Sequence, residues 1–418
     1  HLSIRRQRQM CIRDSIDTAY EYLEIRYKDK GLRILGAIMF IIYQIGRMAI
    51  IMYLPSMVLA NLTGINVYLL IVAMGVIAII YSYTGGLKSV LWTDFIQGCV
   101  LIAGIVFSLI FLISTINGGF GAIMSELTEG GKFLSSQEPI FNANIFKTSV
   151  FLLIVGGGLN TFSSYISSQD IVQRFTTTTD IKQLKKMTYG NLVLSLFVAT
   201  VFYLIGTALY VFYNQNPQLL QTAQQDQIFA SYIAFQLPVG ITGIVLAAIY
   251  AAAQSTLSTG LNSVATSWTL DIQNFITKDM SMEKQTKVAQ YISLGVGIAS
   301  IIMAVILANG GVNSAYEWFN GFMGLVLGVL AGIFVLGIFF KKATKAGAYA
   351  GFIASAIAVV VCKYGGFDVS IWSYSIISIG VSVIVGMIVS LMTQSQLVDK
   401  KTLNEATVYY NESEIANS

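Results

Sequence analysis

The sequence has very few of the residues that carry out covalent chemistry at neutral pH. Histidine occurs once, at position 1, which excludes catalysis or metal binding by a group of histidines. The three cysteines (Cys11, Cys99 and Cys362) are far apart and form no CxxC pair, so we expect neither a disulfide framework nor a cysteine metal site. Cys99 and Cys362 lie in apolar runs and are predicted to be small core residues. With no nucleotide-binding loop in the chain either, we expect no enzyme.

Charge is scarce as well. Charged residues make up 11% of the 418 residues, whereas a soluble domain has about 25%. Apolar residues make up 55%, and the mean hydropathy is +0.69. The net charge of only +4, from 25 basic and 21 acidic residues, argues against a nucleic-acid partner. The composition therefore predicts an all-α polytopic membrane protein whose main surroundings are the lipid bilayer.

Long apolar runs fill most of the chain. A bilayer core of about 30 Å needs about 20 apolar residues per crossing helix. About ten stretches meet this requirement, so we expect about ten transmembrane helices. They cover roughly 33–61, 66–84, 89–117, 148–173, 187–213, 239–269, 285–309, 318–340, 345–363 and 369–393.

The polar segments between these runs alternate in charge. Lys or Arg occurs in every second segment, beginning with 26–33 and 85–89, whereas the intervening segments, such as 118–147, carry few or none. The positive-inside rule then predicts that both visible ends, including the tail 394–418, are cytoplasmic. We expect a multi-pass protein of the inner (plasma) membrane. The stretch 217–238, bounded by two prolines, is predicted to be a short external helix that covers an opening, or else a passive surface loop.

The first residues do not fit this pattern. Residues 1–15 have no initiator Met, no apolar core of a signal peptide and no helical period. We interpret them as a foreign segment joined to a membrane domain of residues 16–393, with a basic cytoplasmic tail as the alternative.

Arg47 lies near the middle of the first apolar run. A charge at that depth costs at least about 2.5–3.5 kcal/mol on insertion scales, so it needs a function or a partner. A guanidinium binds a carboxylate through two hydrogen bonds, which suggests an anionic small-molecule substrate. The alternative is an arginine that ties helices together through carbonyl groups or a buried acid.

Asp94 is the other charge that stands out in an apolar run, near the predicted cytoplasmic start of 89–117. A buried carboxylate suits a hard cation, which takes oxygen ligands. The alternative is an acid favoured at a helix N-terminus by the macrodipole and solvated by lipid headgroups.

A cluster of hydroxyl side chains marks the run 239–269. At 100° per residue, Ser255, Ser258 and Thr259 share one helix face, and Thr256 lies toward the adjoining side. Four hydroxyls in five positions favour cation binding. The alternative is a seam of small residues whose hydroxyls bond back to their own helix.

Glycine is concentrated in two of the runs. The sequence Gly156–Asn160 is poor material for an unbroken helix, and broken helices at mid-membrane supply ligands in transporters. We therefore predict a break there, with close helix packing as the alternative. Glycines at 321, 324, 328 and 332 indicate a second flexible helix or a packing face.

Three segments together carry a family resemblance. YSYTGGLKSVLWTDFIQ (81–97), SSQDIVQRF (167–175) and STLSTGLNSVATSWTLDI (255–272) resemble, in order and spacing, segments typical of the sodium:solute symporter family. The resemblance implies an inverted-repeat transporter fold of five plus five core helices. The first visible run then looks like the third core helix, so we expect the first two core helices to be absent and the visible chain alone to be inactive.

The resemblance also assigns roles to the residues already singled out. Ser255, Thr256 and the carbonyl of Ala252 resemble the eighth-helix half of the main sodium site. A second sodium site is implied for Asp94, Ser258 and Thr259, which share Ser255. Arg47 is placed where sialic acid carriers hold the substrate carboxylate, and Asn160 resembles a sixth-helix substrate contact. Ser164 and Tyr165 stand where sugar carriers have aromatic pairs, which disfavours a glucose-type pocket and favours Ser164 as a contact of another solute.

The function predicted from the sequence is sodium-coupled symport of a small carboxylated solute, with sialic acid favoured and two Na+ ions per cycle. A carrier of a neutral sugar, proline or pantothenate is the alternative within the family. A passive channel is the alternative from another class, although the polar groups gather at a few depths instead of forming a continuous line. The oligomeric state is left open.

Overall fold

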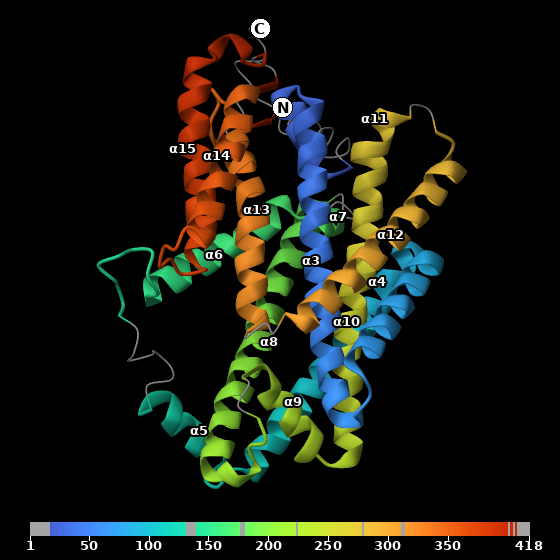
Figure 1. Ribbon diagram of the computed structural model, residues 1–418, viewed down its shortest axis with the longest axis vertical. Helices are drawn as coiled ribbons and strands as arrows, with labels where there is room; N and C mark the ends of the chain where they lie inside the picture. The colour runs from blue at the N-terminus through green and yellow to red at the C-terminus, as the bar shows by residue number, and fades with distance from the viewer. Residues whose placement is uncertain are drawn as a thin grey trace.

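The computed structural model describes residues 17–130, 139–175, 180–222, 225–277, 280–310, 314–399, 402–403 and 406–407, with the backbone only at 84–91, 181 and 225. These ranges are helical and contain no strand, which confirms the predicted all-α class (Figure 1). The helices are α2 (Ala19–Tyr27), α3 (Lys30–Thr63), α4 (Val67–Thr115), α5 (Gly119–Thr128), α6 (Val150–Ser167), α7 (Gln169–Phe175), α8 (Ile181–Gln215), η1 (Pro217–Leu219), α9 (Gln225–Phe235), α10 (Val239–Ser267), η2 (Trp268–Gln273), α11 (Asn274–Ile276), α12 (Met282–Asn309), α13 (Ala315–Phe339), α14 (Lys345–Tyr364), α15 (Ser373–Met392) and η3 (Gln394–Gln396).

Within the described ranges, nine helices are long and apolar enough to cross a membrane. The remaining run of the ten predicted, 66–84, corresponds to the shorter apolar segment Val67–Tyr83. It belongs to α4, whose helical backbone continues through Thr115 with no loop at 85–89. Tyr81 is hydrogen-bonded to Thr93, although residues twelve apart in a straight helix lie about 18 Å apart along its axis. The helix therefore bends sharply between its two apolar halves.

The helices form two groups joined by α3. On one side α13, α14 and α15 pack together, and on the other α10 packs along α4 and beside α12 (Figure 1). Glycines line the α13 face toward α15: Gly324 lies against Tyr374, Gly328 against Ser378. These glycines thus serve close packing, the second of the two interpretations, within the continuous helix α13.

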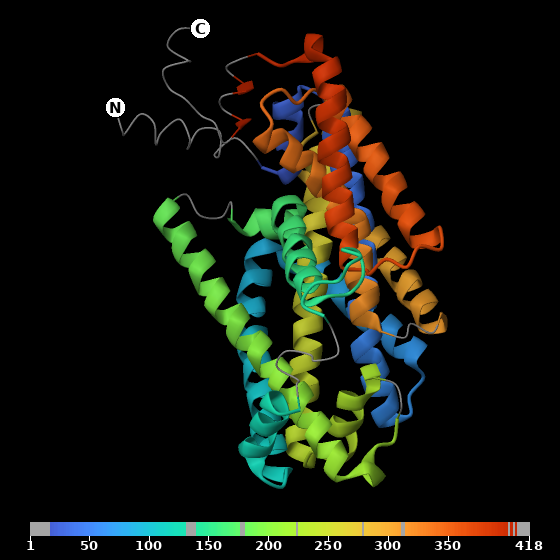
Figure 2. The same ribbon diagram turned by 90° about the vertical axis from the view of Figure 1, so that its left-hand side faces the viewer.

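The first half of α8 stands apart from the other helices along one edge, whereas its second half packs against α4 and α5 (Figure 2). Its exposed side chains are large and apolar, among them Leu192, Val193 and Phe197. Exposed apolar patches of this extent fit lipid surroundings better than water. Cys99 is exposed as well, so its prediction as a core residue was wrong.

The predicted break at Gly156–Asn160 was wrong. α6 runs unbroken from Val150 to Ser167, and the helix is interrupted only at Ser168, whose backbone is extended (φ −96°, ψ 117°). Gly156 instead lies against the main chain of Trp372, where a larger residue would collide. Close packing between α6 and the start of α15 is therefore the reason for this glycine.

The first and last described residues lie at the same end of the molecule (Figure 1). Tyr22 Oη on α2 donates to the carbonyl of Ala406 at 2.9 Å. Arg26, also on α2, is fully buried and donates to carbonyl groups at the end of α13, including Gly337 O at 2.8 Å and Phe340 O at 2.9 Å. α2 thus caps the C-terminus of α13, where carbonyls have no helical partner.

Candidate functional site

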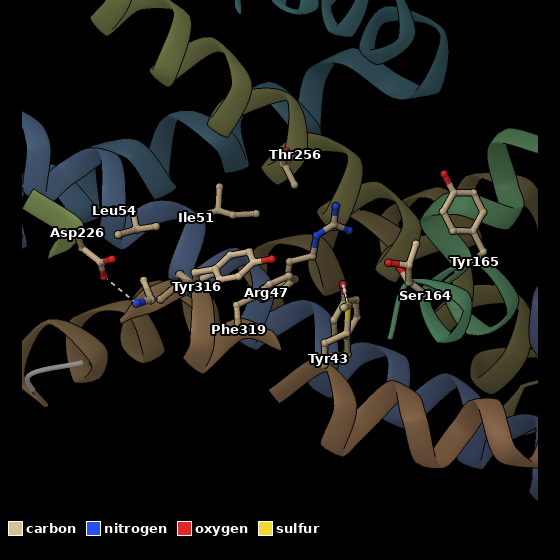
Figure 3. Close-up of a pocket in the computed structure, with 14 residues that line it drawn as sticks. Tyr43, Arg47, Ile51, Leu54, Ser164, Tyr165, Asp226, Thr256, Tyr316 and Phe319 are labelled. Atoms are coloured by element: carbon tan, nitrogen blue, oxygen red, sulfur yellow. Dashed lines mark hydrogen bonds between the residues drawn. The ribbon is translucent and has the colours of Figure 1, made fainter. Parts of the chain in front are cut away.

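A cavity of about 580 Å³ opens between α3, α6, α10 and α13, with α9 at one end (Figure 3). It combines aromatic and aliphatic walls with hydroxyl groups and two charged side chains. The lining residues are Tyr43, Arg47, Ile50, Ile51, Leu54, Thr161, Ser164, Tyr165, Asp226, Thr256, Ala315, Tyr316, Phe319 and Met323. A few polar groups within a mostly apolar wall are typical of small-molecule sites.

Arg47 lies at the centre of this cavity. Its guanidinium points between Thr256 on α10 and Tyr43, which lies one helical turn before Arg47 on α3 (Figure 3). The side chain is 25% exposed, and Nη1 forms an ion pair with Asp170 on α7. Both interpretations of Arg47 therefore find support, because the same side chain faces the cavity and ties α3 to a buried acid.

Asp170 was not singled out from the sequence. Its carboxylate is 5% exposed and accepts a second hydrogen bond, from Ser168 Oγ, at the point where the chain leaves α6. A charge inside the predicted apolar run 148–173, and within a family segment already quoted, was the available signal. The helix interruption beside Asp170 is at Ser168, about ten residues beyond the glycines that suggested a break.

Asp94 is the centre of a second polar cluster. It accepts hydrogen bonds from Ser255 Oγ at 2.6 Å and from Thr259 Oγ1 at 3.1 Å, both on α10. Arg174 on α7, another residue that the sequence analysis missed, reaches the same carboxylate at 2.9 Å and Thr259 Oγ1 at 2.9 Å. The structure thus brings together three of the residues predicted for a cation, with an arginine beside them.

The other hydroxyls of α10 bond to their own helix. Ser258, 1% exposed, donates to Ser255 O at 3.0 Å, and Thr256 donates to Ala252 O at 3.0 Å. This is the bonding pattern expected for a packing seam. Thr256 also lines the cavity, so it lies between the space beside Arg47 and the cluster around Asp94.

The two candidate residues of α6 occupy different environments. Ser164 lines the cavity, as does its neighbour Tyr165. Asn160 is 4% exposed and does not line it. Its amide donates to Asn320 Oδ1 at 3.1 Å and accepts from Ser375 Oγ at 2.9 Å, which joins α6 to α13 and α15.

The donors around Asp94 fit a hard cation better than a transition metal. Hydroxyl and carboxylate oxygens surround it, and the described part of the chain contains no group of three or more His, Cys, Asp or Glu side chains.

The chain was compared with known proteins. Residues 9–355 match the profile of the Sodium:solute symporter family. The chain is 35% identical to the sodium/sialic acid symporter SiaT of Proteus mirabilis (strain HI4320), over 89% of this chain and 75% of the relative. It is 31% identical to the sodium/sialic acid symporter NanT of Aliivibrio fischeri (strain ATCC 700601 / ES114), over 92% and 75%. Among solved structures, it resembles the substrate-bound outward-open state of a Na+-coupled sialic acid symporter, with a TM-score of 0.82 and 34% identity over 90% of this chain and 77% of the other.

Proposed function

Because the chain belongs to the sodium:solute symporter family, whose members are sodium-coupled transporters and not enzymes, we propose that it transports a sialic acid together with sodium ions. The observation that carries the proposal is the position of Arg47, a permanently charged guanidinium inside a cavity of ligand size in the membrane domain. Two relatives that are named sodium/sialic acid symporters support it.

The substrate carboxylate binds Arg47 in this proposal. Guanidinium and carboxylate form paired hydrogen bonds, which favours an anionic solute over a neutral one. Ser164 and Thr161 supply hydroxyls for the polyol part of the sugar, and Tyr316 and Phe319 supply apolar surface for its ring. Asn160 acts indirectly in this proposal. Both ends of its amide are already engaged by Asn320 and Ser375, so it holds the cavity wall in place and does not bind the substrate itself.

Two sodium ions accompany the substrate in this proposal. The Ala252 carbonyl, Ser255 and Thr256 form the α10 part of one site. Asp94, Ser258 and Thr259 form the other, together with Ser255. Oxygen donors of these types suit a hard cation, and Asp94 supplies the negative charge. Thr256 lies on the cavity wall, so a sodium ion bound at the first site changes the position of a side chain that faces the substrate.

The proposed location is the plasma membrane, which the chain crosses several times, with both described ends in the cytoplasm. The contact between Tyr22 and Ala406 supports one common side for the two ends. The Lys and Arg residues of the segments at that end support the cytoplasmic side.

A competition experiment tests the substrate. Radiolabelled sialic acid is bound in sodium to the reconstituted chain, extended at its N-terminus with the two core helices that the family resemblance implies. Unlabelled sialic acid, glucose, proline and pantothenate are then added in turn. We expect only sialic acid to displace the label. We expect Arg47→Ala to abolish binding of the label. Arg47→Lys keeps the charge but cannot form the paired hydrogen bonds of a guanidinium, so we expect it to weaken binding. Displacement by a neutral solute, or full binding by Arg47→Ala, refutes the anionic substrate.

A further inference from the structure

The short helix α7 carries two opposite charges that reach into the two halves of the site. Asp170 and Arg174 are four residues apart, so they lie on the same face of the helix. Asp170 contacts Arg47 of α3, and Arg174 contacts Asp94 of α4. One seven-residue helix therefore bridges the group proposed to bind the anion and the group proposed to bind the second sodium ion.

Each charge on α7 has the sign of the ligand expected at that place. The Asp170 carboxylate engages Arg47 as a substrate carboxylate would. Arg174 Nη2 lies 2.9 Å from Asp94 Oδ2 and 2.9 Å from Thr259 Oγ1. A hard cation binds by direct contact with such oxygens, so a sodium ion and the Arg174 N–H group compete for them.

We propose that α7 is a charge-exchanging latch: Arg174 competes with the second sodium ion for Asp94 and Thr259, while Asp170 competes with the substrate anion for Arg47. Binding of sodium displaces Arg174 and loosens α7. The loosened helix releases Arg47 for the substrate, and the substrate in turn favours sodium. Such reciprocity follows whenever two ligands bias the same structural element. The latch rests on the proposed function, because it needs both an anionic substrate and an ion at Asp94.

The two ends of the latch differ in how readily they open. The Arg174 side chain is 48% exposed, whereas Asp170 is 5% exposed and also held by Ser168. An exposed ion pair contributes little to stability, whereas a buried pair is strongly held. Sodium therefore opens the latch at the Arg174 end first, and the substrate binds second.

The test is an equilibrium binding experiment on the 418-residue chain in lipid nanodiscs, with 22Na+ and radiolabelled sialic acid as probes. The coupling factor is the ratio of the sialic acid Kd in choline to that in saturating sodium. In Arg174→Gln we expect the half-saturating sodium concentration to fall about fivefold or more, and the coupling factor to fall by a similar ratio. Lys185→Gln, which removes an exposed charge on α8, leaves both values unchanged.

Asp170→Asn tests the other end. We expect tighter sialic acid binding in choline and a smaller coupling factor. The double variant loses no more coupling than either single variant, because both act through one helix. A merely structural role for α7 would lower the thermal midpoint without changing the coupling factor.

The outcomes separate the latch from the function on which it rests. Absence of sodium-dependent sialic acid binding in the wild type refutes the proposed function, and the latch with it. If the wild type binds both probes and Arg174→Gln binds sodium equally or more weakly, the function stands. Arg174 then supports Asp94 instead of competing for it, and the latch is refuted.

Discussion

The carboxylate of Asp94 on α4 accepts a hydrogen bond from Ser255 Oγ on α10, with 2.6 Å between the two oxygens. This contact joins the bent helix α4 to the hydroxyl face of α10. It also places a negative charge against the hydroxyls that the sequence analysis assigned to sodium. The properties of this pair decide whether one ion or two are bound.

Asp94→Asn keeps the shape of the side chain and removes its charge. We expect the Hill coefficient for sodium to fall from about two to about one, because only the site at Ala252, Ser255 and Thr256 remains. Sodium-dependent uptake at several sodium concentrations measures it. Asp180→Asn is the matched control, since Asp180 is an exposed N-cap of α8 and Asn caps equally well. An unchanged coefficient in Asp94→Asn would remove the second site from the account.

Gly156 and Gly158 form a matched pair on α6. A Cβ at Gly156 collides with the main chain of Trp372, whereas nothing lies within 4 Å of one at Gly158. We expect Gly156→Ala to lower the free energy of unfolding by about 1–3 kcal/mol through overpacking. Gly158→Ala should raise it by up to about 1 kcal/mol, since alanine favours the helix. Thermal unfolding in detergent compares them, and equal effects would contradict the packing of α6 on α15.

These glycines also show how far the sequence could be read. Composition and the length of the apolar runs were sufficient for the helical class and, within the described residues, for nine of the ten predicted spans, because both depend on local chemistry. Whether three glycines break a helix or pack against another depends on Trp372, more than two hundred residues away, and the sequence pattern does not contain that neighbour.

The residues of the candidate site also fall into those that the sequence pattern predicted and those that only tertiary contacts reveal. The helical period correctly put Ser255 and Thr259 on one face, and the structure brings both to Asp94. Asp170 and Arg174 were overlooked because their importance comes from partners on other helices. Asn160 has a suitable amide, yet Asn320 occupies it, which only tertiary packing determines.

Arg26 is predicted to be essential for stability. It is fully buried, and four carbonyl groups accept its hydrogen bonds, Gly337 O in the last turn of α13 and three more in the segment 340–343 that follows it. Arg26→Ala removes all of these hydrogen bonds from a buried position, and we expect a loss of about 2–4 kcal/mol in the free energy of unfolding. The exposed Lys284→Ala on α12 should change it by less than about 0.5 kcal/mol. Similar thermal midpoints for the two variants would show that α2 does not cap α13.

Arg33 and Asp271 form a second buried pair at the same end. Arg33 Nε lies 2.7 Å from Asp271 Oδ1, and Asp271 is fully buried and also accepts from Thr18 and Ser267. A double-mutant cycle with Arg33→Gln and Asp271→Asn should give a coupling energy of about 1–3 kcal/mol in thermal unfolding. The exposed pair Lys287–Glu283 on α12 serves as the reference and should give about 0.5 kcal/mol or less. A value no larger than this reference for the buried pair would argue against its structural role.

Uptake of radiolabelled sialic acid into proteoliposomes tests the central claim most directly. The chain, extended at its N-terminus with the two core helices that the family resemblance implies, is reconstituted, and an inward sodium gradient is compared with an equal choline gradient. We predict accumulation above the external concentration with sodium only. We also predict stimulation by an inside-negative potential, because two sodium ions with one anion carry net positive charge inward, at roughly 2.3 kcal/mol per charge per 100 mV. Uptake that is equal in sodium and choline would contradict sodium-coupled symport by this chain.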